Sequence, residues 1–413
     1  MKLDKQKKRI LLAILVVAFI QMPGLALTPG INQIKTTAFT EYSLSSIQTA
    51  LSVSGFAQPI AAFGAALLIN KRIISKKHVI FIGLILLAAT GALAMFAHTR
   101  FWHLAMLSTL LGISTGFFMS NMFGLIFDNY NESERQSIVG WQTSVINAGG
   151  IAMSLTGGLL ASYIWYGGYT ILLSGLPAAI LVAALVPNYK SPPKKETRRG
   201  VARNARTGDN DKEIAPRTTR GINPKVYYYS AAALLFFMSY SVCGNNLSTH
   251  IAKLGNSATT GIASAFQMGG GVCSGLIFGN LSKKMGDYSL SIALICVSLG
   301  FMLLSYFATS LLIVFIAVFI VGMALSIMLP RCIFMVSTLA TDKSTSATAT
   351  ALVSVVSPSI GAFLSPIVYT NLTTTLFGDS TSARYSFVGF VVLAIAIAIT
   401  AITAAHRRRR GAS

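Results

Sequence analysis

The sequence has few charged residues, and none of its carboxylates lies in an apolar stretch. Charged residues make up only 11% of the 413 residues, whereas soluble globular proteins carry about 25%. All 12 Asp and Glu residues fall outside the long apolar stretches. The chain therefore has too little polar surface to cover a water-soluble body. It also lacks the intramembrane carboxylate that commonly relays protons in pumps and transporters.

Cysteine is scarce and is not arranged to bind a metal. The sequence has no cluster of His, Cys, Asp and Glu, no paired carboxylates and no Gly-rich nucleotide-binding motif with a lysine. We therefore predict no metal, no cofactor and no enzymatic activity, and exclude an ATP-driven pump unless a partner supplies the ATPase. The four cysteines lie in apolar stretches and are interpreted as reduced, small hydrophobic residues: Cys243, Cys273, Cys296 and Cys332.

What the sequence does contain is a series of long apolar runs. A membrane span needs roughly 20 mainly apolar residues. A segment in lipid must satisfy its own backbone hydrogen bonds, which favours helices, and runs this long do not fit the short alternating strands of a membrane barrel. We predict an all-α integral membrane fold with twelve spans: 10–29, 45–69, 79–98, 103–127, 139–163, 168–187, 226–247, 259–281, 289–307, 310–334, 346–368 and 385–405.

Basic residues are concentrated on one side of this predicted topology. Of the 33 Lys and Arg residues, 28 fall in segments that share one face of a twelve-span chain, as the positive-inside rule describes for the cytoplasmic face. This asymmetry explains the net charge of +21 without nucleic acid as a partner. We therefore place both termini in the cytoplasm and the protein in the cell membrane. On the opposite face lie Lys35, Arg100, Lys253 and Arg384.

A basic segment divides the chain into two similar parts. Residues 188–225 hold eleven basic residues among prolines and glycines, a composition typical of a flexible linker. The linker is either a solvated tether or also binds anionic headgroups. It separates an N-terminal six-helix bundle (1–187) from a C-terminal six-helix bundle with a basic tail (226–413).

The two parts also resemble each other in sequence. GINQIKTTAFTEYSLSSIQTALSV, which starts at Gly30, corresponds to GNNLSTHIAKLGNSATTGIASAF, which starts at Gly244. Internal repeats of this kind are a hallmark of secondary transporters, whose binding site lies at the repeat interface near the membrane midplane. We therefore predict two pseudo-symmetric bundles around a central site.

The loop after the second span resembles a motif of the major facilitator superfamily. The family pattern is G-x-x-x-D-R-x-G-R-K, and this chain has ALLINKRIISKK from Ala66, in which Asn70 replaces the acid and the glycines are lost. A second copy at residues 279–287 contains Lys283 and Lys284. The resemblance covers nearly the whole chain in architecture and implies the twelve-helix fold of that family.

The same resemblance implies an ion pair at the cytoplasmic end. In the family, a basic residue of this loop pairs with an acid at the inner end of helix four, where Asp128 stands in this chain. We predict that Asp128 pairs with Arg72 or a neighbouring lysine such as Lys71 and latches one conformation. The alternative is a solvated loop charge.

The fifth span resembles the antiporter signature of the family, G-x8-G-x3-G-P-x2-G-G. Gly140, Gly149, Gly157 and Gly158 occur in register, with Met153 and Ser154 in place of Gly-Pro. Glycines at this spacing let helices approach closely, a packing role that needs no antiport. An arginine that supports proton coupling in some branches is absent from the fourth span. These departures argue against a proton antiporter based on carboxylates.

Arg331 is the only charged residue inside a predicted span. A charge in a span costs at least about 2.5–3.5 kcal/mol and is a functional candidate by default. Arg331 either binds an anionic group of the substrate or extends to the headgroups from the end of its span. Neutral polar residues complete the candidate substrate site, with hydrogen bonding between helices as the alternative role: Gln21, Asn121, Asn147, Tyr240, Asn245 and Gln267.

Together these features predict a secondary active or facilitative transporter that moves a small organic solute, with organic anions as one candidate class, by alternating access. Multidrug or toxin efflux is the alternative, and an integral membrane enzyme is a weaker one. Lys35, His250 and Lys253 form either a positive outer vestibule or solvated loops. We expect a monomer whose partners are the solute and membrane lipids.

Overall fold

The computed structural model describes residues 4–187, 223–286, 288–339 and 349–411. Most of the basic linker predicted at 188–225 lies outside these residues, as does the side chain of Lys283. Within the described ranges, twelve helical segments are long and apolar enough to cross a membrane, which confirms the predicted all-α, twelve-span fold. Each half contributes six of them.

The first half (α1–α8) and the second half (α10–α17) each bury their own apolar core. One core runs from Ile10 to Val186 and the other from Val226 to Ile399. The main helices of the first half are α1 (Lys5–Phe19), α3 (Leu44–Asn70), α4 (Lys76–Ala94), α5 (Phe101–Asn129), α6 (Glu132–Tyr163), α7 (Gly167–Thr170) and α8 (Gly175–Leu185). Those of the second half are α10 (Pro224–Ile251), α11 (Ser257–Met285), α12 (Tyr288–Met302), α13 (Leu311–Leu339), α15 (Ser357–Ser365), α16 (Asn371–Phe377) and α17 (Thr381–Gly411).

The first span is broken in its middle. The α-helix ends at Phe19, and the chain resumes with the short turns η1 (Pro23–Ala26), η2 (Thr28–Gly30), α2 (Ile31–Gln33) and η3 (Ile34–Ala38). Pro23 has no N–H to donate to the carbonyl of Phe19, so regular hydrogen bonding stops there. The span reaches from Lys5 to Ala38, longer at both ends than the predicted 10–29, because these tight turns carry the chain onward.

The eleventh span is interrupted as well. Two π-helical segments, η6 (Leu352–Val356) and η7 (Pro366–Thr370), flank α15 and its Pro358. Irregular π turns inside membrane helices often occur at functional positions. The span ends at Phe377, nine residues beyond the predicted end at residue 368.

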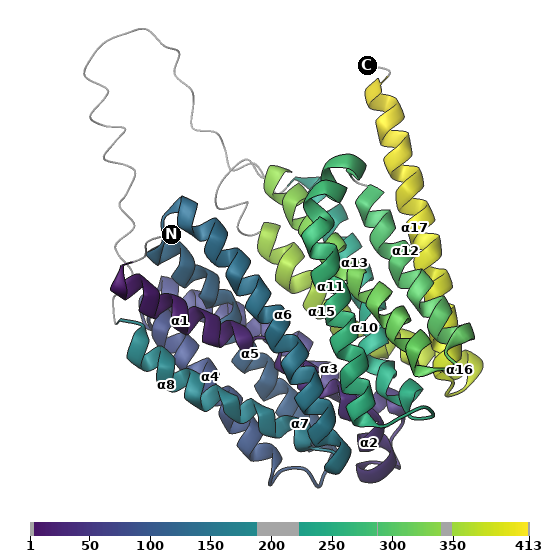
Figure 1. Ribbon diagram of the computed structural model, residues 1–413, viewed down its shortest axis with the longest axis horizontal. Helices are drawn as coiled ribbons and strands as arrows, with labels where there is room; N and C mark the ends of the chain where they lie inside the picture. The colour runs from purple at the N-terminus through teal and green to yellow at the C-terminus, as the bar shows by residue number, and fades with distance from the viewer. Residues whose placement is uncertain (1–3, 188–222, 287, 340–348, 412–413) are drawn as a thin grey trace.

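The most extensive contacts between the two halves are those of α6 with α11 and of α3 with α15, and the outer part of the broken first span also contacts α10 and α11. Both chain termini lie at one end of the molecule, called the inner end here, and the two groups of helices diverge toward it, while they converge at the opposite, outer end near α2 and α16 (Figure 1). Ser154 Oγ donates a hydrogen bond to the carbonyl of Gly261 across the halves at 2.9 Å. A Cβ added to Gly55 would lie 2.8 Å from the carbonyl oxygen of Ser359.

Candidate functional site

The predicted substrate residues lie at three different depths. With a rise of about 1.5 Å per residue, Gln267 is about 15 Å from the outer end of α11 and Tyr240 about 16 Å from the outer end of α10. Both therefore lie near the middle of a membrane about 30 Å thick. The break at Gln21 falls at a similar depth, because it packs against the central part of α6. These three residues form the midplane level.

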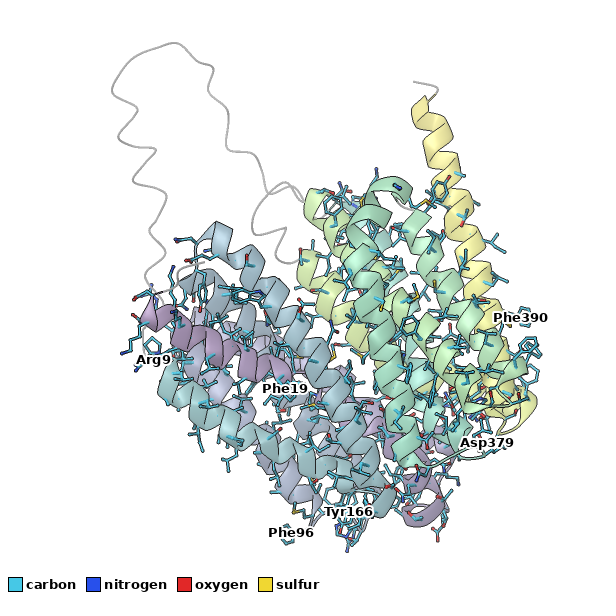
Figure 2. All side chains as sticks on the ribbon, in the orientation of Figure 1. Arg9, Phe19, Phe96, Tyr166, Asp379 and Phe390 are labelled. Atoms are coloured by element: carbon cyan, nitrogen blue, oxygen red, sulfur yellow. The ribbon has the colours of Figure 1, made fainter. Side chains whose placement is uncertain are left out.

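Gln21 stands in the break of the first span. Its side chain is only 5% exposed, and its Oε1 has no hydrogen-bond partner among the described residues. A buried acceptor without a partner costs about 1–3 kcal/mol. Figure 2 shows Phe19 at the point where the ribbon of α1 stops. An interrupted helix with an unsatisfied amide at the midplane is the arrangement from which transporters build substrate sites.

Side chains from both halves meet beside this break. A Cβ added to Gly150 of α6 would lie 3.6 Å from Met22 Sδ and 3.4 Å from Met268 Cε. Met22 follows Gln21 in the first half, and Met268 follows Gln267 in the second half. Gln267 is 8% exposed and faces the phenol of Tyr240 on α10. Among the described residues, the side chains that these contacts bring together at the midplane level are amides, thioethers and one phenol, all of them uncharged.

Arg331 lies on the inner side of this level. Gly322 of α13 contacts the backbone of Gln267 and so marks the midplane level on this helix. Arg331 follows Gly322 by nine residues, which is about 13 Å along the helix. Because α13 continues to Leu339, Arg331 lies about 12 Å before the helix end, and it is only 8% exposed. Its guanidinium stands 5.7 Å from the ring centroid of Phe334.

Of the remaining polar candidates, Asn147 lies close to the midplane level, whereas Asn121 and Asn245 lie at other depths. Asn121, in the inner third of α5, donates its amide to the carbonyl of Phe117 at 2.7 Å, so part of its capacity is used within its own helix. Asn147 is half-buried on α6, two residues before Gly149. Asn245 lies near the outer end of α10, where its carbonyl oxygen accepts a hydrogen bond from Gln48 at 2.7 Å. The structure therefore does not gather all six neutral candidates at one point.

Arg384 was expected on the outer face, just outside the last span predicted at 385–405, and its place outside the span is wrong. The arginine lies in the first turn of α17, within the last span, and is fully buried. It pairs with Asp379 and donates to Thr374 Oγ1 at 2.9 Å and Asn246 Oδ1 at 3.2 Å. Sequence reasoning missed it because the predicted span began one residue later. The polar pair Asn245 and Asn246 inside an apolar run was the available signal.

The sequence profile of the Major Facilitator Superfamily matches residues 10–366. The chain belongs to this superfamily. Its fold resembles that of the nucleoside transporter NupG (14% identity, 97% of this chain and 99% of the other covered, TM-score 0.72). It also resembles a POT family transporter in complex with 5-aminolevulinic acid (14%, 95% and 95%, 0.73) and an inward-facing, occupied bacterial homologue of the human lysosomal transporter Spinster (14%, 98% and 98%, 0.72). Identities this low establish the fold alone. No curated protein matches the sequence.

In this superfamily member, Asp128 forms an ion pair with Lys76. The Lys76 Nζ to Asp128 Oδ2 distance is 2.6 Å, and the pair joins the start of α4 to the end of α5. Lys71 and Arg72 are exposed at the end of α3, where Arg72 adopts a left-handed conformation with φ of 57°. Lys284 is also exposed. Because Lys76 and Asp128 both belong to the first half, their bond does not itself tie the two halves together.

The glycines of α6 serve two different neighbours. Gly149 and Gly157 receive the backbone of the broken first span, with Phe19 and Ala26 in van der Waals contact. Gly158 faces the second half, where a Cβ would lie 2.8 Å from Gly261 Cα. Gly140 differs from the expected packing role, because open space of at least 4 Å surrounds its missing side chain. Helices approach closely where no side chain intervenes.

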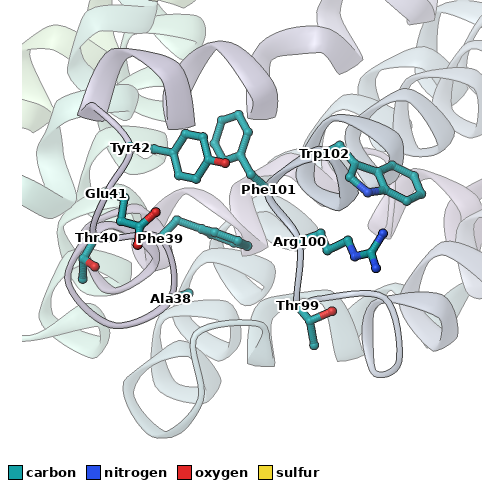
Figure 3. Close-up of a pocket in the computed structure, with 9 residues that line it drawn as sticks. All are labelled: Ala38, Phe39, Thr40, Glu41, Tyr42, Thr99, Arg100, Phe101 and Trp102. Carbon is teal, nitrogen blue, oxygen red and sulfur yellow. The ribbon is translucent and has the colours of Figure 1, made fainter.

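The outer end carries a surface pocket of about 540 Å³ that is not part of this central region. It is lined by two loops of the first half and contains Glu41, Arg100 and the stacked rings of Tyr42 and Phe101 (Figure 3). The nearby Lys35 donates to the carbonyls of Thr40 and Tyr42 at 2.8 Å each, so its charge is held by the loop. His250 instead approaches Thr381 Oγ1, 3.4 Å from its Nδ1, and Lys253 is exposed.

Proposed function

We propose that this transporter moves a small organic solute across the cell membrane by alternating access. The observation that carries the proposal is the midplane level. There, the broken first span places an unsatisfied amide, Gln21, beside residues of the second half. Broken helices at a repeat interface are where secondary transporters bind substrates, and both repeats contribute here.

The charge distribution supports an inner end that faces the cytoplasm. Lys7 and Arg9 lie in α1, and Lys76 and Lys77 are the first residues of α4. Lys7 pairs with Glu134 at the start of α6 and Lys76 with Asp128 at the end of α5, so these cations lie toward the end that carries the termini, as the positive-inside rule requires of a cytoplasmic face. With this orientation, the halves meet on the outside and diverge toward the cytoplasm. The arrangement is therefore proposed as the inward-facing member of the transport cycle.

We further propose that the solute carries an anionic group. Arg331 is a buried cation within a span, and a guanidinium binds a carboxylate through two parallel hydrogen bonds. Arg331 lies between the midplane and the inner end, so it is placed to attract an anion on its path to or from the cytoplasm.

The test is a thermal-shift screen of the purified protein against organic acids and lipophilic cations, followed by transport of the hits in proteoliposomes. A bound ligand stabilises the state that binds it. Arg331→Gln is expected to abolish stabilisation and transport of a carboxylate. The matched control, Lys284→Gln, removes an exposed charge at the inner end and should leave both unchanged. Undiminished carboxylate transport by Arg331→Gln would refute the anion site.

Efflux of lipophilic compounds is a second candidate, which the thioethers of Met22 and Met268 favour. Methionine side chains adapt to differently shaped apolar ligands. Stabilisation by lipophilic cations, retained in Arg331→Gln and lost in Met268→Ala, would support this function over anion transport.

A further inference from the structure

A buried charged network joins the two halves at the outer end. At its centre, Arg384 is fully buried and pairs with Asp379, which lies at the end of the molecule remote from the termini (Figure 2). The same guanidinium donates to Thr374 Oγ1 at 2.9 Å and to Asn246 Oδ1 at 3.2 Å. These partners all belong to the second half, so the ion pair and both hydrogen bonds of Arg384 are made within that half.

Gln48 of α3 connects the first half to this network. Its Nε2 donates to Asn246 Oδ1 at 3.1 Å and to the carbonyl of Asn245 at 2.7 Å. Its Oε1 accepts a hydrogen bond from Thr370 Oγ1 at 2.8 Å. The side chain is only 1% exposed. One glutamine of the first half therefore inserts into the second half with both ends of its amide bonded.

The orientation of Asn246 decides whether Gln48 finds its acceptor. Asn246 is fully buried, and its Nδ2 donates to the carbonyl of Val242 at 3.0 Å. Its Oδ1 is held by the guanidinium of Arg384, which is a stronger donor than a neutral amide. The two bonds together point Oδ1 toward Gln48. Without the cation, a rotated Asn246 would present its amide nitrogen to Gln48 and lose the bond.

We propose that Arg384 is a positioning residue of the transport cycle, which holds Asn246 so that Gln48 closes the outer side. The inference rests on the proposed alternating access. Separation of the halves breaks the three bonds of Gln48 but leaves Arg384 paired with Asp379 and Thr374. No buried charge is thus left unpaired when the outer side opens, which would otherwise be strongly unfavourable.

The proposal is tested with spin-label distances in the full chain, reconstituted in lipid nanodiscs with the four native cysteines replaced by alanine. One label pair, Glu41→Cys with Leu376→Cys, reports the outer side. A second pair, Ile73→Cys with Thr338→Cys, reports the inner side. All four positions are exposed, and each pair has one member in each half. Thermal unfolding of each variant verifies that it is folded.

Gln48→Ala removes three hydrogen bonds between neutral groups, and Arg384→Lys removes the charge-assisted bond of the guanidinium to Asn246. Each is expected to raise the ratio of outer-open to outer-closed molecules about tenfold. The double variant should exceed Gln48→Ala alone by little, because both act through one joint. Asn246→Asp should shift the ratio in the opposite direction, because a carboxylate binds both donors more tightly. Ser154→Ala, which removes a hydrogen bond between the halves elsewhere, is the control. Its effect on the ratio should be the same with and without Arg384→Lys.

The positioning role would be overturned if Gln48→Ala shifts the ratio of outer-open to outer-closed molecules and Arg384→Lys does not. Additive effects of the two substitutions would overturn it as well. If Arg384→Lys does not fold, Asn246→Asp decides instead. A rise in the ratio of outer-open to outer-closed molecules in this variant would overturn the positioning role. A single distance distribution in every variant, with and without organic acids, would instead refute alternating access and thus the proposed function itself.

Discussion

The glycines of α6 allow a matched test of how the first span is held. Gly149 and Gly140 belong to the same helix and the same sequence motif. A Cβ added to Gly149 would lie 2.6 Å from the carbonyl carbon and 2.8 Å from the Cα of Phe19, whereas a Cβ added to Gly140 would meet nothing within 4 Å. We predict that Gly149→Ala impairs stability and transport and that Gly140→Ala does not.

The size of the effect follows from the atoms that must move. The obstacle is backbone, which cannot rotate away as a flexible side chain can. The carbonyl oxygen of Phe19 would lie closer to that Cβ than the carbonyl carbon and Cα do, so the end of α1 must shift by more than about 1 Å relative to α6 to reach an ordinary contact. Overpacking of this kind costs about 1–3 kcal/mol. Both substitutions replace glycine with alanine within α6, which favours the helix by about 1 kcal/mol in each case. Gly140→Ala, which meets no obstacle, is therefore expected to be neutral or slightly stabilising.

The measurement is the thermal unfolding midpoint of detergent-purified protein, together with uptake or ligand stabilisation. Gly149→Ala should unfold several degrees lower than Gly140→Ala and should lose ligand stabilisation, because the shift displaces Gln21. Equal midpoints and equal ligand responses would show that Phe19 does not contact Gly149 closely. They would also refute the placement of Gln21 at the midplane site.

Two further predictions concern the inner end. Asp128→Asn removes the ion pair with Lys76, which is partly solvated, so it should lower the free energy of unfolding by less than about 1 kcal/mol. Chemical unfolding measures this change. If the pair instead latches one conformation, the substitution should shift the distance between the two inner spin labels. The hydrogen bond from Lys7, followed by the N–H of Asn131, lowers the pKa of Glu134 below 4.5. The pair should therefore persist above pH 4.5 and be lost as the pH falls through the lowered value. Glu134→Gln should flatten the acid limb of a stability profile; an unchanged limb would contradict this linkage.

The membrane fold was readable from one-dimensional properties. Apolar run length and the side preference of basic residues depend only on local composition, so the number of spans was predictable. The family was suggested by the resemblance of the loop after the second span and of the fifth-span glycines to its motifs. Boundaries were less so, because proline-rich segments such as 23–29 continue across the membrane as tight turns instead of ending. Asp128 was predicted to pair with Arg72 or a neighbouring lysine, and in the structure its partner is Lys76 at the start of α4.

The sequence alone determined that the chain has twelve membrane spans, because hydrophobic length is set residue by residue. Tertiary structure decided which polar residues act together. It placed the helix break at Gln21 near Met268, and it linked the buried Arg384 to Gln48 through Asn246. These pairings depend on how distant helices pack, and a polar residue in an apolar run has the same sequence signature whether it faces a substrate or another helix.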